Sequence, residues 1–179
     1  MKAVTAILIG GLIAGALDIL YAFAVYGPLA PSLGLASSST PIEILQSVYG
    51  GWIGRDAAHA GGAMTAVLGA CTHFSIAIVM AAVYAVLFAR PGASNPILWG
   101  FIYGLILFVV MNYIVVPLSA AADGYFTNGA DAVERIHATV SRTLQFKRPL
   151  LLAGTVFTHT VLVGIPIAWA SAKFGNQQD

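Results

Sequence analysis

Long apolar stretches separated by shorter polar connections are the most regular feature of the chain. Four stretches are long, at positions 3–26, 63–89, 96–117 and 149–172. Lys, Arg, Asp and Glu are absent from 57–89, 91–122 and 149–172, and the first stretch contains a single such residue, Asp18. A helix of roughly 20 apolar residues crosses a bilayer core, whereas barrel strands are shorter and alternate in polarity. The pattern predicts an all-α polytopic membrane protein, with one domain built as a four-transmembrane-helix bundle.

Helix-end signals agree with these limits. Asn95 before Pro96 is typical of an N-cap followed by proline at the first helical position, and Pro149 is placed to begin the last helix. Gly27-Pro28 is expected to end the first helix. A tight turn over 90–95 joins the second and third helices. The other two connections are long, and we call the side that carries them the loop face.

The first long connection predicts a helix that lies along the membrane surface. Thr40-Pro41-Ile42-Glu43 matches a capping box with proline at the first helical position. Apolar and aromatic residues then recur at helical spacing, namely Ile42, Leu45, Tyr49 and Trp52. We expect Gly50-Gly51 to weaken this helix.

The second long connection predicts a similar helix after a turn at Asn128-Gly129. An apolar stripe of Val133, Ile136, Val140 and Leu144 is accompanied by Arg135, Arg142, Lys147 and Arg148. A basic amphipathic helix between membrane spans is typical of a position along lipid headgroups. An ordinary surface helix packed on the bundle is the alternative.

Composition supports a lipid-facing surface. Only 8% of the residues are charged and 59% are hydrophobic, whereas soluble domains are about a quarter charged. The net charge of +1 gives no electrostatic case for nucleic acid as a partner. The single cysteine, Cys71, excludes an internal disulfide and a thiolate metal cage.

Charge also gives a weak prediction of orientation. The loop face carries Arg55, Arg135, Arg142, Lys147 and Arg148, whereas the face with both termini carries Lys2, Arg90, Lys173 and the amino group. Positive residues accumulate on the cytoplasmic side of membrane proteins. Five charges against four favour a cytoplasmic loop face.

Each predicted span contains one conspicuous polar residue: Asp18, His73, Asn112 or His159. Counted along the helices, all four lie roughly 8–15 Å from the loop face, so they can meet inside one bundle. A lone carboxylate in hydrocarbon is costly and seeks a partner, for which a histidine is suited. We therefore predict an intramembrane polar cluster. It serves either a function or only the register of the helices.

Arg55, Asp56 and His59 precede the second span and are candidates for the mouth of that site. Arg55 can receive an anionic headgroup or substrate. In the alternative, this segment is a solvated helix start, in which Asp56 complements the helix dipole and Arg55 extends to the membrane surface.

Three functions remain open from the residues. The first is a non-enzymatic accessory subunit or small transport-related protein that uses the polar cluster and no cofactor. The second is an electron carrier that binds b-type haem through His73 and His159. The third is a membrane enzyme acting on a lipid or quinone, with Asp18 and a histidine as acid–base pair. Expected partners are membrane lipids, with other membrane subunits or a second copy of the chain as candidates.

Two further patterns concern relationships. Two short patterns occur twice in the chain, and we call this repetition the internal echo. They are the Thr-His pair, at Thr72-His73 and Thr158-His159, and the glycine motif, at Gly11-x-x-x-Gly15 and Gly100-x-x-x-Gly104. Either a duplicated helical hairpin or chance explains the repetition.

Five features of the sequence resemble those of one family. They are the Gly-x-x-x-Gly-x-x-Asp pattern ending at Asp18, the Gly54-Arg55 pair, the small residues before His73, Met111-Asn112-Tyr113 and Val116-Pro117-Leu118. This is a family of small, uncharacterised bacterial inner-membrane proteins. The resemblance covers the four spans but not residues 123–148. It implies architecture and location, and it implies no activity.

Overall fold

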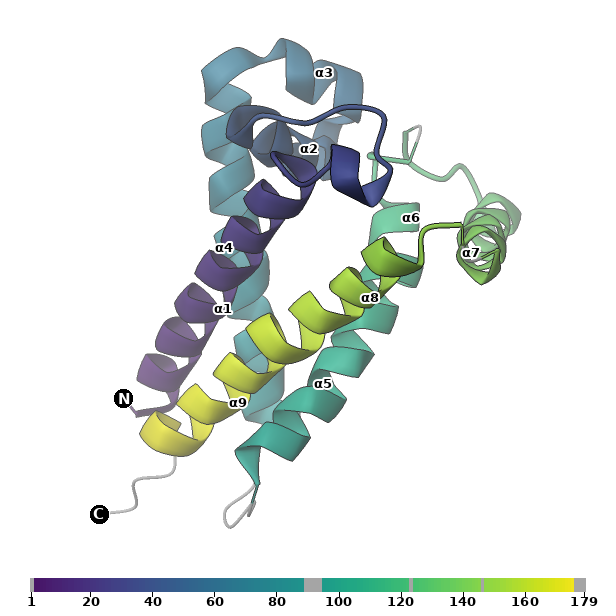
Figure 1. Cartoon of the computed structure of the whole chain (residues 1–179). Coiled ribbons are helices and arrows are strands. Elements are labelled where there is room, and N and C mark those ends of the chain that lie inside the picture. Colours follow the sequence, from purple (N-terminus) through teal and green to yellow (C-terminus); the bar gives the residue numbers. More distant parts are fainter. Residues whose placement is uncertain (1, 89–94, 123, 146, 176–179) are drawn as a thin grey trace. The chain divides into compact units, whose positions relative to one another are not determined.

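The computed structural model of the chain describes residues 2–88, 95–122, 124–145 and 147–175, and every regular element within them is helical (Figure 1). In chain order the elements are α1 (Lys2–Tyr26), the 3₁₀ turn η1 (Pro31–Leu33), α2 (Pro41–Ile53), α3 (Arg55–Ala60), α4 (Gly62–Leu87), α5 (Pro96–Val110), η2 (Met111–Val115), α6 (Val116–Leu118), α7 (Gly129–Leu144), α8 (Pro149–Phe157), η3 (Thr158–Gly164), α9 (Ile165–Ala170) and η4 (Ser171–Gly175).

Four helices are long and apolar enough to span a membrane, as predicted. They are Lys2–Tyr26, Gly62–Leu87, Pro96–Leu118 and Pro149–Gly175. The Asn95 side chain accepts a hydrogen bond from the Leu98 N–H at 3.0 Å, which confirms it as a cap. The predicted turn over 90–95 and the predicted helix end at Ala89 lie, apart from Asn95, outside the described residues.

The third and fourth long helices are not uniform α-helices, which the sequence analysis did not foresee. Both contain a π-helical segment, η2 and η3, in which the hydrogen bonds reach back five residues: Val116 N–H donates to Met111 O, and Ile165 N–H donates to Thr160 O. Pro117 directly follows Val116, and Pro166 directly follows Ile165. Because proline lacks an N–H and its ring presses on the carbonyl four residues earlier, it disturbs the α-helical ladder at these points. The third π-helical segment, η4, has no such proline.

The chain groups into two compact units. The first comprises Met1–Tyr21, His73–Phe108 and Gly154–Asp179, and the second comprises Ala22–Thr72 and Val109–Ala153. In the first unit the described parts of α1, α4, α5 and α8–α9 run side by side (Figure 1). They enclose a core that includes Ala14, Tyr84, Tyr103, Leu107 and Ile167. That all residues form a single domain stays a prediction.

In the second unit, α2 begins with the predicted capping box. The Thr40 N–H donates to Glu43 Oε2 at 2.7 Å, and the Glu43 N–H donates to Thr40 Oγ1 at 3.3 Å. The hydrogen bond from the Thr40 N–H to Glu43 Oε2 is the main cause that lowers the pKa of the Glu43 carboxyl below its ordinary value. The Gly50-Gly51 pair does not interrupt the helix. The helix continues to Ile53 and ends at Gly54, whose φ of 87° is left-handed.

Asn128 begins α7 instead of forming part of a separate turn. Its side chain accepts hydrogen bonds from the N–H groups of Ala130 and Asp131, so Asn128 is an N-cap and Gly129 is the first helical residue. The predicted helix is therefore present, with its turn residues incorporated in its start. Its position at a membrane surface stays a prediction.

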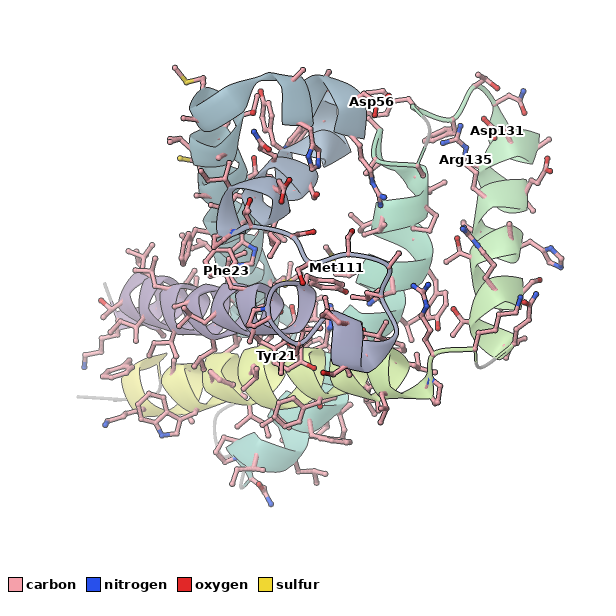
Figure 2. All side chains as sticks on the ribbon, turned by 45° about the horizontal axis from the view of Figure 1, so that its top comes forward. Tyr21, Phe23, Asp56, Met111, Asp131 and Arg135 are labelled. Carbon is pink, nitrogen blue, oxygen red and sulfur yellow. The ribbon has the colours of Figure 1, made fainter. Side chains whose placement is uncertain are left out.

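Arg135 of α7 fixes the loop that precedes this helix. Its guanidinium donates to the carbonyls of Ala122 and Gly124, each at 2.6 Å, and to Asp131 Oδ1 at 2.9 Å. Figure 2 shows Asp131 and Arg135 next to one another at the start of α7. The hydrogen bond from Arg135 and a second one from the Thr127 N–H hold the pKa of Asp131 below its ordinary value.

Candidate intramembrane polar site

Glycines on α1 bring two helices of the first unit into close contact. A Cβ added at Gly11 would lie 2.7 Å from Ile78 Cα, and one at Gly15 would lie 2.9 Å from the Phe74 ring. Only residues without a side chain permit this approach. Asp18 follows Gly15 by three residues, so it lies on nearly the same side of α1, facing α4.

The Asp18 carboxylate has two partners from other helices. Thr158 Oγ1 of η3 donates to Asp18 Oδ1 at 2.8 Å. Nε2 of His73, on α4, lies 3.9 Å from Asp18 Oδ2, which is within ion-pair range but too long for a direct hydrogen bond. We call Asp18, His73 and Thr158 the polar site. The Asp18 side chain is 31% exposed, whereas that of His73 is 12% exposed.

His73 is oriented by the backbone of α1. Its Nε2 lies 2.8 Å from the Gly15 carbonyl oxygen. A carbonyl can only accept, so Nε2 carries the hydrogen, and the lone pair of the neutral ring lies on Nδ1. The glycine motif, therefore, both permits the helix contact and exposes the carbonyl that fixes this imidazole.

His159 bonds within its own helix, and its place in the predicted polar cluster stays a prediction. Its Nδ1 donates to Thr155 O of its own helix at 2.8 Å, and its ring meets the edge of Phe108 at a centroid distance of 6.1 Å. The partner that η3 supplies to Asp18 is instead the neighbouring residue, Thr158. Asn112 lies in η2 of the second unit, so its place in a cluster with Asp18 stays a prediction.

Thr158 was missed as a site residue because threonine is common in membrane helices, where its hydroxyl usually bonds within its own helix. Thr160 does so, donating to Val156 O at 2.8 Å. The signal that could have identified Thr158 is its place beside His159 in the Thr-His pair. Tyr21 was also missed. It lies on α1, where Figure 2 labels it, one turn after Asp18. Its hydroxyl lies against Gly154, and its ring centroid lies 6.0 Å from that of Phe157.

The internal echo in the sequence is also present in the contacts between helices. Gly11 and Gly15 of α1 approach Ile78 and Phe74, which follow His73 by five and one residues. In the same way, Gly100 of α5 approaches Gly164 and Ile165, and Gly104 approaches His159 and Thr160. Both glycine motifs thus pack within the chain, each against the helix that carries a Thr-His pair.

The two pairs of helices differ in one respect that matters for chemistry. By the spacing from the glycines, the position of Asp18 corresponds to Leu107 in the second pair. Leu107 is buried in the apolar core, so only the first pair combines a carboxylate with its histidine.

The predicted mouth residues lie on the short helix α3 of the second unit, where all three are exposed. His59 Nε2 lies 3.1 Å from Ser47 Oγ of α2, and Arg55 packs its backbone against Gly50. Asp56 is in the first turn of α3, where a carboxylate complements the helix dipole. A role of Arg55, Asp56 and His59 as the mouth of the polar site stays a prediction.

The histidines do not match each other as ligands for a haem. His159 donates through Nδ1 and leaves Nε2 with a lone pair, an arrangement usual for metal-bound histidine. His73 has the opposite arrangement, because its Nε2 donates to Gly15 O. The geometry does not fit a pair of Nε2 ligands, so we derive no step through a haem. Among the described residues no group of three His, Cys, Asp or Glu side chains is placed to hold a metal ion.

Comparisons of the chain with models of protein families, with curated proteins and with solved structures find no match. The family resemblance drawn from the sequence motifs stays a prediction.

Proposed function

We propose that the chain is a multi-pass integral membrane protein of the bacterial inner membrane, with its loop face in the cytoplasm. The apolar side chains of the long helices support insertion, since many of them are exposed in the isolated chain, including Leu20 at 62%, Val79 at 60% and Val86 at 79%. Lipid is the solvent that such a surface fits.

Aromatic residues at the helix ends give further support. Trp99 stands in the first turn of α5 and Trp169 in α9, and both side chains are partly exposed. The Lys173 ammonium lies 4.7 Å from the centre of the Trp169 ring. Tryptophan with a neighbouring lysine is typical of the boundary between lipid and water.

Within this membrane protein, we propose a small transport-related function in which the polar site exchanges protons. The observation that carries the proposal is the Asp18 carboxylate, which is the single charged residue between positions 3 and 26, is bonded to Thr158 and lies within 3.9 Å of His73. Carboxylate–histidine pairs inside membrane spans are typical of proton relays. The Nδ1 lone pair of His73 can accept a proton.

Proton flux into liposomes tests this proposal. The full chain is reconstituted with an internal pH dye, and a potassium diffusion potential drives protons inward. We expect Asp18→Asn to reduce the flux at least about tenfold, because the amide cannot exchange a proton. Glu134→Gln, a change of the same chemistry on α7, serves as the control and should leave the flux unchanged.

Equal flux through the wild-type and Asp18→Asn proteins would contradict the role of Asp18. A wild-type protein without flux would overturn autonomous transport and favour the accessory-subunit function, which stable co-purification with a membrane partner then tests.

A further inference from the structure

Positive charge is segregated at the passage from α7 into α8. The first turns of α7 contain Asp131 and Glu134, and Asp131 is paired with Arg135. From 136 to 149 the chain contains Arg142, Lys147 and Arg148 but no Asp or Glu. The three basic side chains are exposed.

The helices themselves explain only one of these cations. Arg142 lies in the last turn of α7, where a cation complements the negative end of the helix, and its guanidinium contacts Ala138 O and Thr139 Oγ1. Lys147 and Arg148 stand instead immediately before Pro149, the first residue of α8. A helix start is already partly positive, so cations there are electrostatically unfavourable for the helix. The described contacts pair neither Lys147 nor Arg148 with a carboxylate.

Apolar side chains flank the cations on both sides. Leu144 ends α7 and is 65% exposed, and Leu150, the second residue of the long apolar helix, is 67% exposed. A cationic segment between exposed leucines at the start of a span fits the level of lipid phosphates, with the leucines directed to acyl chains.

From this juxtaposition we propose that Arg142, Lys147 and Arg148 form a binding site for the phosphate of an anionic phospholipid. The proposal rests on membrane insertion but not on proton exchange. A lipid with a net negative charge is preferred over a zwitterionic one, because a choline headgroup would bring its own cation to a site without carboxylates.

Lipid retention by the intact, detergent-purified protein tests the proposal. Native mass spectrometry measures the binding of phosphatidylglycerol and of phosphatidylcholine with the same acyl chains. We expect wild-type protein to prefer phosphatidylglycerol by at least about thirtyfold, as two or three juxtamembrane cations provide. The double variant Lys147→Gln/Arg148→Gln should reduce this preference to about fivefold or less, because Arg142 is the one cation of the site that remains.

The matched control is Lys2→Gln/Lys173→Gln, which removes the same charge from the other end of the spans and should keep the preference. If both double variants lose the preference for phosphatidylglycerol equally, net charge alone explains the preference, and the proposed site is contradicted. A wild-type protein without preference would overturn it as well. If the Lys147/Arg148 variant does not fold, the wild-type preference must still fall when salt is raised, and a preference independent of salt contradicts the proposal.

Discussion

Residues that carry no charge position the partners of Asp18. Gly11 and Gly15 allow α4 to approach, the Gly15 carbonyl turns the His73 ring, and Thr158 contributes a hydroxyl. The sequence identified Asp18 and His73 because a titratable residue in an apolar span is conspicuous. It marks Thr158 only by its place beside His159, because the direction of one hydroxyl depends on how the two helices are rotated against each other.

Replacing Thr158 by valine tests the hydrogen bond between Thr158 and Asp18. The change keeps the shape but removes the donor to Asp18, and we expect a loss of about 1–2 kcal/mol in the free energy of unfolding, since the carboxylate is partly exposed. Unfolding by a denaturing detergent in mixed micelles measures it.

Thr160→Val is the matched control, because that hydroxyl bonds to its own helix, and it should cost less. Thr158→Ser should restore most of the stability. Equal losses for the two valine variants would show that the bond to Asp18 contributes nothing specific.

Among the elements, the long helices were predictable and their interior irregularities were not. Length and absence of charge define a span regardless of its neighbours. The π-helical segments η2 and η3 depend on how Pro117 and Pro166 disturb a ladder that continues past them. The extension of α2 through Gly50-Gly51 had a similar cause. Both glycines lie against neighbouring atoms, Gly50 against Arg55 and Gly51 against Ser119, so packing overrides their low helix propensity.

The Arg135 contacts give a prediction for α7 and its preceding loop. The folded pKa of Asp131 lies below its ordinary value, so the contribution of this carboxylate to stability is present above that ordinary value. It is lost as the pH falls through the lower, folded pKa. In Arg135→Ala the pKa of Asp131 should rise towards its ordinary value, and the amides of 119–122 and 124–128 should exchange with solvent at least about fivefold faster.

Carboxyl NMR titration and hydrogen exchange measure the two effects. Arg142→Ala, another arginine on the same helix, should change neither. An unchanged titration of Asp131 in Arg135→Ala would contradict the assigned cause of its lowered pKa.

At the scale of the whole molecule, the proposed function requires that the four long helices cross a bilayer. The candidate site gains its chemical significance from that setting, because a carboxylate beside an imidazole is unremarkable in water and costly in hydrocarbon. The sequence predicted the four long helices and a helix in each of the two long connections, α2 and α7. Which partner the chain serves depends on surfaces whose chemistry is shared by many membrane proteins, so the residues alone could not predict it.

Cysteine labelling in sealed membrane vesicles tests these crossings most directly. Cys71 is first replaced by alanine, and single cysteines are introduced at Lys2, Ala93, Gly175, Ser38 and Glu134. A membrane-impermeant reagent should reach the first three positions from one side of the membrane, and the last two from the opposite side, which the charge distribution assigns to the cytoplasm. A split among Lys2, Ala93 and Gly175, or labelling of all five positions from the same side, would contradict the four-span account.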